Sequence, residues 1–382
     1  MKRPAKVCAV VTARPSYSRI FTALRAIDEH DGLELSIVTS GSAVLDKYGS
    51  VHDAMAGDGF EVTASVHMVI EGDSPENMAR TTGLGLLDLP NVFSQIQPDY
   101  VISIADRFET IATSIAAAYM NIPLVHVQGG EVSGSIDDKV RDANTMLADL
   151  HLVATEGARK RVLGMGVPED SVAVTGCPSI DLAAHAAKEA NSGSLSFDPY
   201  ERYGGVGSQP SLENGYIVVL QHPVTQEFIE ARVQTRQTLD AVASLELPVL
   251  WFWPNMDAGA EGSSGAIRAF REREDSSHFH FFKNMTPGDF LELLLNSKCL
   301  VGNSSVGIRE CSYLGVPVVN IGTRQTGRER GVNVRDVAYE RNEIEGAVAS
   351  QIAGGRYARD DLYGQGNSGK QIADCLAAHW DQ

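Results

Sequence analysis

The chain has 382 residues, with 43% hydrophobic and 21% charged residues, which indicates a globular protein with room for two domains. Its formal net charge of −17 argues against a surface for nucleic acid or anionic membranes, so an anionic ligand needs a local basic site. The five cysteines show no metal-ligand spacing, and their odd number favours a reducing compartment. The apolar run at residues 7–11 is too short for a signal peptide, and no run has the length of a membrane span. We therefore expect a soluble, cytoplasmic protein without a nucleic-acid or membrane partner.

The first half of the chain alternates uninterrupted apolar runs with helical patterns. The runs predict strands at 6–12, 35–39, 100–105, 124–127, 151–155 and 172–175. The helical patterns lie at 20–29, 77–87, 107–120 and 138–148. Apolar strands without alternation, separated by helices, are typical of a parallel sheet that is covered on both faces.

The second half repeats this organisation after a segment rich in Gly, Ser and Pro at 188–214, which we interpret as a linker or surface excursion. Strands are predicted at 216–221, 248–253, 278–282, 299–301 and 316–321, and helices at 226–245, 266–274, 287–295 and 306–314. A last helix at 369–379 is expected to return to the first domain. The expected domains are therefore 1–182, with 366–382 packed against it, and 183–365, facing each other across a cleft at the strand carboxyl ends.

The segment 300–310 offers the best candidate for a phosphate site. A strand ends there, and Ser304 and Ser305 open a helix whose free N–H groups and dipole favour an anion. The loop after the next strand adds Arg324 and Arg328, and Glu310 could accept hydrogen bonds from ribose hydroxyls. The Ser pair alone is better explained as a helix cap, but together with the arginines it favours a nucleotide diphosphate.

Three features of the first half could carry chemistry. Arg14 follows the first strand, where it would meet a phosphate or lie exposed in a loop. Asp106 follows the strand 100–105 and could act as base or acid if partly desolvated, or else cap the helix 107–120. The loop 126–138 combines glycines, which allow close approach to a sugar, with carboxylates, which can transfer protons; the alternative is a flexible loop with an Asp cap.

Two strand ends of the second half carry further polar groups. His222 directly follows a strand, where an imidazole could contact phosphate or shuttle a proton, although a single His is more often structural. Asn255 and Asp257 follow the next strand and offer an amide and a carboxylate to sugar hydroxyls, with a plain turn as the alternative.

Eight segments occur in an order that matches a known family: 13–18, 105–108, 129–138, 176–179, 221–225, 254–259, 302–305 and 322–325. Over nearly its whole length the chain resembles the UDP-N-acetylglucosamine 2-epimerases. It is most similar to the hydrolysing branch that makes N-acetylmannosamine for sialic acid, which includes the epimerase half of the animal bifunctional epimerase/kinase.

The resemblance implies an α/β, GT-B-like fold of two Rossmann-like domains, with UDP held mainly by the second. On matching positions it implies a catalytic set of Arg14, Asp106, Glu131, Asp137 and His222. The implied binding set for the UDP-sugar is Arg14, Ser18, Gln128, His222, Asn255, Asp257, Ser304, Ser305, Glu310 and Arg324. The family reaction is anti-elimination of UDP to 2-acetamidoglucal, followed by hydration to N-acetylmannosamine. It uses no nicotinamide and needs no metal, and relatives form homodimers or homotetramers.

The chain also departs from the family pattern. Gln128 stands where many relatives carry a catalytic Glu, and an amide cannot take up a proton at neutral pH, so Glu131 or Asp137 would have to take over that role. Arg268 and Arg271 match arginines that bind the inhibitor CMP-sialic acid in the animal enzyme, although arginines on an exposed helix are usually only solvated. Other readings are a non-hydrolysing epimerase, an enzyme acting on a modified UDP-amino sugar, a UDP-sugar-binding protein with low turnover, or a glycosyltransferase of the same fold.

Overall fold

The computed structural model describes residues 3–45, 51–71, 74–104, 106–133, 136–189, 194–254, 258–272 and 276–381. The chain divides into two compact units. The first unit comprises Met1–Glu131, Ile136–Asp181 and Tyr363–Gln382, and the second comprises Val132–Ser135 and Leu182–Leu362. No helix of the described ranges combines the length and the apolar character that crossing a membrane requires.

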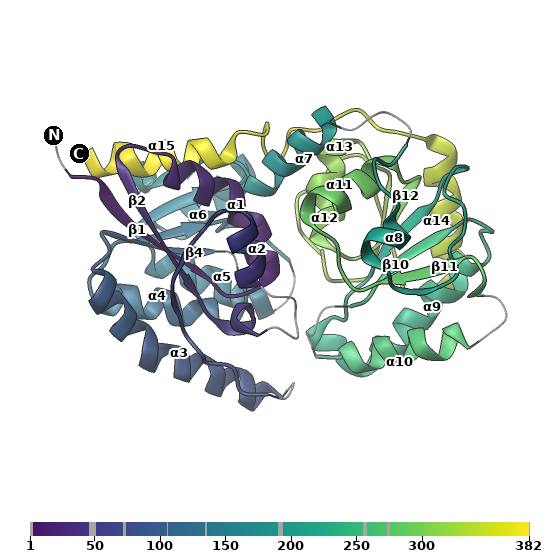
Figure 1. Cartoon of the computed structure of the whole chain (residues 1–382), viewed down its shortest axis with the longest axis horizontal. Helices are drawn as coiled ribbons and strands as arrows, with labels where there is room; N and C mark the ends of the chain where they lie inside the picture. Colours follow the sequence, from purple (N-terminus) through teal and green to yellow (C-terminus); the bar gives the residue numbers. More distant parts are fainter. Residues whose placement is uncertain are drawn as a thin grey trace. The chain divides into compact units, whose positions relative to one another are not determined.

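The first unit is built on a parallel sheet with the strand order β3-β2-β1-β4-β5-β6-β7 (Figure 1). Its strands are β1 (Ala5–Val11), β2 (Leu33–Thr39), β3 (Val62–Ser65), β4 (Tyr100–Ile104), β5 (Leu124–Val127), β6 (Leu150–Val153) and β7 (Val172–Val174). Its helices are α1 (Arg14–Asp28), α2 (Val51–Gly57), α3 (Pro75–Ile96), α4 (Thr110–Tyr119), α5 (Ile136–Leu147), α6 (Glu156–Gly164) and α15 (Ser368–Asp381). Helix α7 (Pro178–Glu189) begins in this unit, and most of it belongs to the second. Short 3₁₀ turns lie at η1 (Gly41–Val44) and η3 (Glu169–Ser171).

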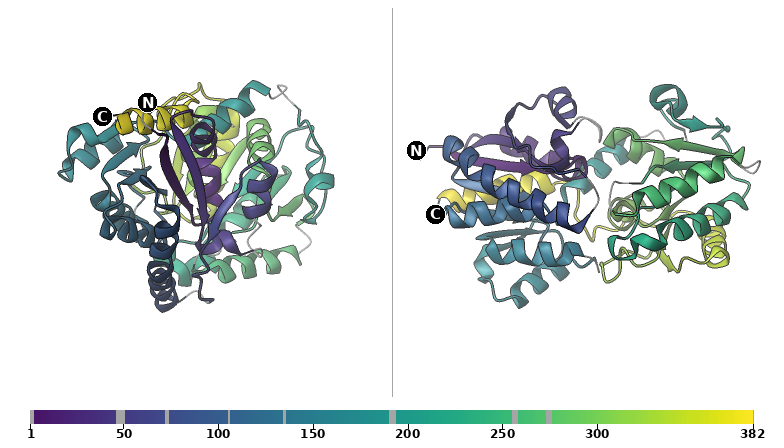
Figure 2. Two further views of the ribbon diagram at one scale, coloured as in Figure 1. Left: turned by 60° about the vertical axis from the view of Figure 1, so that its left-hand side comes forward. Right: turned by 90° about the horizontal axis from the view of Figure 1, so that it is seen from below.

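Strand β1 shows why the strands of the first unit have continuous apolar sequences. Val7, Ala9 and Val11 pack in the core cluster that includes α1 and α15, whereas Cys8 and Val10 pack in the cluster that includes α3 and α4. Both faces of the sheet are therefore buried under helices, as Figure 2 shows from two further directions, and every strand position favours an apolar side chain.

Helix α15 is attached to the first unit through a carboxylate. Asp181 of α7 accepts hydrogen bonds from the N–H groups of Ser368 and Gly369, at 2.8 and 2.7 Å, and from the hydroxyl of Thr22 at 2.8 Å. A Cβ on Gly369 would lie 2.4 Å from the main-chain oxygen of Thr22, so only glycine lets α15 approach α1 this closely. Figure 1 shows the two helices side by side.

The second unit has the strand order β14-β13-β12-β9-β10-β11-β8, parallel except for β8. Its strands are β8 (Val206–Gly207), β9 (Ile217–Leu220), β10 (Val249–Phe252), β11 (Phe279–Phe282), β12 (Cys299–Gly302), β13 (Val318–Ile321) and β14 (Val334–Val337). Its helices are α8 (Pro199–Tyr203), α9 (Ala231–Ala243), α10 (Ala260–Arg271), α11 (Pro287–Asn296), α12 (Ser305–Ile308), α13 (Glu310–Leu314) and α14 (Arg341–Gly354), and η4 (Thr225–Glu230) precedes α9.

Two expectations about individual elements were wrong, and a third left out short regular elements. Helix α1 begins at Arg14 rather than at residue 20, because proline is well suited to a first helical turn and Pro15 supplies it. The segment expected to be a linker or surface excursion is largely exposed, and it contains α8 and the edge strand β8, which pairs antiparallel with β11. The helix expected at 306–314 is interrupted at Arg309, so α12 and α13 are both short.

Candidate functional site

The carboxyl ends of β1 and β4 lie at the point where the strand order of the first sheet reverses. In open α/β sheets this switch point is the usual place for a ligand. The chain after β1 provides Arg14, Ser18 and Arg19 on the first turns of α1, and all three are half-buried. The chain after β4 provides Asp106 and Arg107. Basic and acidic side chains are therefore brought to one edge of the sheet.

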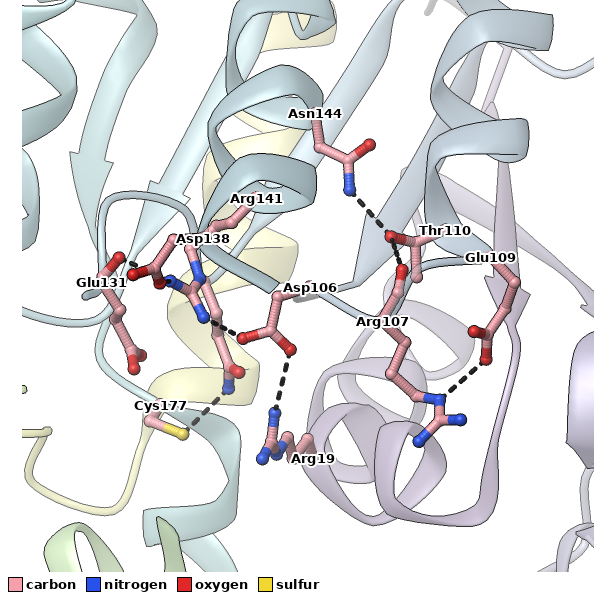
Figure 3. A network of polar contacts seen from close by, with 11 residues as sticks. Arg19, Asp106, Arg107, Glu109, Thr110, Glu131, Asp138, Arg141, Asn144 and Cys177 are labelled. Atoms are coloured by element: carbon pink, nitrogen blue, oxygen red, sulfur yellow. Dashed lines mark hydrogen bonds and ion pairs between the residues drawn. The ribbon is translucent and has the colours of Figure 1, made fainter. Parts of the chain in front are cut away.

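A buried arginine that the sequence analysis did not single out organises the acidic side chains of this edge. Arg141 of α5 is completely buried and donates hydrogen bonds to the carboxylates of Asp106 and Asp138 and, at 2.7 Å, to the main-chain oxygen of Glu131. Arg19 lies 3.9 Å from the other carboxylate oxygen of Asp106. Figure 3 shows the carboxylate of Asp106 between the two guanidinium groups.

The charge of Arg141 is stabilised by its surroundings. Burial alone would lower the pKa of its guanidinium, but the negative charges of Asp106, Glu131 and Asp138 outweigh burial and raise that pKa. A permanent positive charge beside Asp106 favours the ionised carboxylate, which is the form that can accept a proton. Asp138 contacts Arg141, and the candidate catalytic residue Asp137 lies half-buried beside it in the first turn of α5.

Asp106 does not serve as a helix cap. The helix expected at 107–120 begins at Thr110, and Glu109 occupies the N-cap position. Asp106 therefore lies in the loop between β4 and α4, and the alternative reading of this carboxylate as a cap was wrong.

Gln128 is held rigidly at the end of β5. Its main chain has a positive φ of 68°, and its N–H bonds the oxygen of Leu152 at 2.9 Å. The side chain is buried and donates from Nε2 to the sulfur of Cys177 at 2.9 Å. Within the described part of the chain its Oε1 is buried without a hydrogen-bond partner. Gln128 is thus a fixed neutral group at the end of β5.

The glycines after Gln128 serve packing rather than access for a sugar. A Cβ on Gly129 would lie 2.9 Å from both His126 Nδ1 and Thr145 Oγ1, and one on Gly130 would lie 2.4 Å from the oxygen of Ala158. At these two positions the small residues let the loop lie against neighbouring protein atoms.

In the second unit, Asn303 joins the ends of two strands. Its Oδ1 accepts from the N–H of His222 and its Nδ2 donates to the oxygen of His222, both at 2.8 Å. The main-chain oxygen of Asn303 accepts from Arg324 at 3.2 Å and from Gln325 at 2.8 Å. His222 and Arg324 are thereby held at one sheet edge by Asn303, whose role only the tertiary structure reveals.

The helix that we expected to bind phosphate is shorter than predicted. Ser304 caps α12, its hydroxyl accepting from the N–H of Val306 at 3.4 Å, and Ser305 is buried in the first turn. Glu310 begins α13 and is 8% exposed, and within the described ranges its Oε2 is buried without a partner. A buried carboxylate with unused acceptor capacity suits a hydroxyl-bearing ligand.

The remaining predicted residues lie elsewhere or are not described. Asn255 and Asp257 fall outside the described residues. Arg268 is exposed on α10 and pairs with Glu261, and the guanidinium of Arg271 lies 5.9 Å from the ring centre of Phe281. Both arginines have ordinary surface contacts.

Comparison with known proteins identifies the family. A family model described as UDP-N-acetylglucosamine 2-epimerase matches residues 25–377. The chain belongs to the UDP-N-acetylglucosamine 2-epimerase family. The resemblance noted in the sequence is thereby confirmed, and the chain is an enzyme of that family.

Relatives share a quarter or more of the sequence over most of the chain. The UDP-N,N'-diacetylbacillosamine 2-epimerase (hydrolyzing) of Legionella pneumophila is 28% identical, covering 97% of this chain and 95% of the relative. The UDP-N-acetylglucosamine 2-epimerase of Neisseria meningitidis is 27% identical, and the match covers 95% of this chain and 92% of the relative.

Solved structures show the same fold. The epimerase of Neisseria meningitidis bound to UDP-GlcNAc has a TM-score of 0.80 at 16% identity and covers 98% of this chain and 100% of its own. The Methanocaldococcus jannaschii epimerase in complex with UDP-GlcNAc and UDP has a TM-score of 0.81 at 15% identity, with 98% and 99% covered. The expected GT-B-like α/β fold is confirmed.

Proposed function

We propose that this enzyme is a hydrolysing UDP-N-acetylglucosamine 2-epimerase that releases N-acetylmannosamine and UDP. The observation that supports it most is the buried Arg141, which holds Asp106, Asp138 and the main chain of Glu131 at the switch point of the first sheet. Such an arrangement provides carboxylates of fixed position and different surroundings, as a reaction with two proton transfers requires.

The first half-reaction is an elimination. A carboxylate, which we assign to Asp106, removes the proton from C2 of the sugar while the C1–O bond to UDP breaks, giving 2-acetamidoglucal. The C2 proton is weakly acidic, so its removal has to be concerted with departure of UDP. In the second half-reaction water adds its oxygen to C1 and gives one proton to a carboxylate of this edge. A protonated carboxyl group gives a proton to C2 on the face opposite the one from which the first proton left. Because Gln128 cannot donate that proton, we assign this step to Glu131 or Asp137.

The leaving diphosphate needs positive charge. In the first unit Arg14, Arg19 and Arg107 are gathered at the edge that carries Asp106. In the second unit Arg324 and His222 are held by Asn303, and Ser304 begins the short helix α12. We propose that these groups stabilise the charge that grows on the phosphate oxygens as the C1–O bond breaks, and that Glu310 binds the ribose.

A second candidate substrate is a UDP-sugar with acetamido groups at C2 and C4. Two relatives, at 28% and 26% identity, carry the name of a hydrolysing epimerase of UDP-N,N'-diacetylbacillosamine. The chemistry at C1 and C2 is the same for both sugars.

The test is to incubate the enzyme with each UDP-sugar in D₂O and to follow the products by NMR. Free N-acetylmannosamine with deuterium at C2, together with UDP, supports the proposal. UDP-N-acetylmannosamine would identify a non-hydrolysing epimerase. Tight binding of UDP without either product would contradict both and favour a binding protein, and release of UDP only with an added sugar acceptor would indicate a glycosyltransferase.

A further inference from the structure

The carboxylate of Glu109 is buried, and few charges or hydrogen bonds compensate its loss of hydration. Its side chain is 2% exposed and accepts a hydrogen bond from Arg107 Nε at 2.8 Å. Within the described part of the chain its Oε2 is buried without a partner. Burial of a carboxylate is strongly unfavourable unless charges and hydrogen bonds compensate it. One ion pair with half of the acceptor capacity unused is weak compensation, so folding alone does not explain this residue.

Helix α4 does not depend on the Glu109 side chain. Glu109 is the N-cap residue, but its carboxylate makes no capping hydrogen bond. The structure nevertheless makes room for it: a Cβ on Gly41 would lie 3.2 Å from Glu109 Cγ and 2.6 Å from the oxygen of Thr12. The segments after β1 and β2 thus close over the carboxylate, and Gly41 is required for this close approach.

Arg107 is fixed at its main chain as well as at its side chain. Its main-chain oxygen accepts from Thr110 Oγ1 at 2.7 Å, and that hydroxyl in turn accepts from Asn144 Nδ2 at 2.8 Å. With the main chain fixed from α4 and α5 and Nε bonded to Glu109, the plane of the guanidinium is set. Figure 3 shows its two Nη groups directed away from Glu109. Two parallel N–H donors of fixed direction are what a bidentate phosphate contact needs.

We propose that Glu109 is a positioning residue, which orients the guanidinium of Arg107 toward the substrate's diphosphate. This inference rests on the proposed function. Glu109 does not touch the substrate and acts through Arg107 alone. Its negative charge by itself opposes anion binding, so the orientation it confers must outweigh that repulsion.

A double-mutant cycle tests whether Glu109 acts through Arg107. We expect Glu109→Ala to lower kcat/KM about 10- to 100-fold, because a misplaced guanidinium loses most of its effect on the leaving group. Glu109→Gln keeps an oxygen that can accept from Nε and should stay within about threefold of the wild type. In an Arg107→Ala background the Glu109→Ala change should alter kcat/KM by less than about twofold.

A matched control lies at the other end of β4. Asp99 pairs with Arg3 at 2.6 Å next to the amino end of this strand, and Asp99→Asn should leave kcat/KM unchanged. Losses that add up in the double variant would overturn the proposal. The proposal would also be overturned if the activity of Glu109→Ala fell only in proportion to its thermal stability. A gain in activity on removal of the negative charge would overturn it as well.

A second measurement does not depend on turnover. In arginine-labelled protein, the Nε–H of Arg107, assigned with Arg107→Lys, should exchange slowly with solvent and should join the fast-exchanging arginines in Glu109→Ala. An unchanged signal would refute the positioning role. If the wild type turned over no UDP-amino sugar, the proposed function would fail, and the NMR result would still decide whether Glu109 orients Arg107.

Discussion

The fully buried guanidinium of Arg141 donates a hydrogen bond to the carboxylate of Asp106, two residues that are 35 positions apart in the sequence. This contact connects the end of β4 with helix α5, and the same guanidinium also holds Asp138 and the main chain of Glu131. Arg141 therefore fixes the position of the acidic groups at this edge, and its positive charge favours their ionised forms.

Replacement of Arg141 by Met should destabilise the protein strongly. The variant keeps an apolar chain of similar length but removes the cation that bonds the buried Asp106 and the half-buried Asp138, which should lower the free energy of unfolding by about 3–5 kcal/mol. Urea unfolding measures this. Adding Asp106→Asn to the variant should recover part of the loss, since one uncompensated charge is removed. A loss below about 1 kcal/mol would show that the pair contributes little.

Asp106→Asn alone should separate chemistry from binding. The amide oxygen can still accept from Arg141, so the fold should persist, but the group can no longer take up a proton. We expect turnover to fall about 10²- to 10⁴-fold, while the dissociation constant for UDP, measured by calorimetry, changes by less than about twofold. Wild-type rates in this variant would remove Asp106 from the mechanism.

Gln128→Glu tests the departure from the family pattern. The new carboxylate would be buried beside the sulfur of Cys177. We expect turnover to fall and stability at neutral pH to drop by about 1–3 kcal/mol. Burial raises the folded-state pKa of such a carboxyl, so the stability should return as the pH falls through that pKa. A large gain in turnover would instead mean that catalysis at this site depends on a carboxylate at position 128 and that the natural amide of Gln128 lowers the rate.

His151 should make the protein sensitive to mild acid. Burial lowers the pKa of this imidazole below its ordinary value of 6.5. The unfolded state therefore binds a proton at a higher pH than the folded state. The contribution of His151 to the free energy of unfolding is fully present above pH 6.5, and it declines as the pH falls from 6.5 toward the folded-state pKa. Equilibrium unfolding of the wild type and His151→Gln across this range should show a smaller decline in the variant. An equal decline of stability with falling pH in both proteins would contradict the assignment of this effect to His151.

The sequence predicted the long central elements well because they are buried on both faces. It missed the edge strands β3 and β14, whose exposure is mixed, and β8, which has only two residues. It also missed the helices α2, α6, α7 and α14. The three strands are shaped by their neighbours rather than by an apolar pattern. Polar residues that directly follow strands were recognised as candidates because parallel strands end at one sheet edge.

The partners of those candidates could not be predicted in the same way. Arg141 lies within a helix, and nothing in its local pattern shows that it is buried against a carboxylate 35 positions away. The choice between Asp137 and Asp138 depends on the phase of α5, which places Asp138 beside Arg141. The sequence also gave no reason to expect that Glu109 pairs with Arg107 rather than capping α4.

Helix α15 has a consequence for the order in which the protein can fold during synthesis. Its Ile372 and Leu376 are completely buried in the same core as Ile20 and Leu24 of α1. Residues 182–362 leave the ribosome before α15 does, so the second sheet can be finished while the flank of α1 is still uncovered. A truncated chain that ends at residue 362 should then be protease-resistant in the second unit and sensitive in the first, and that uncovered flank is where a chaperone would be expected to bind.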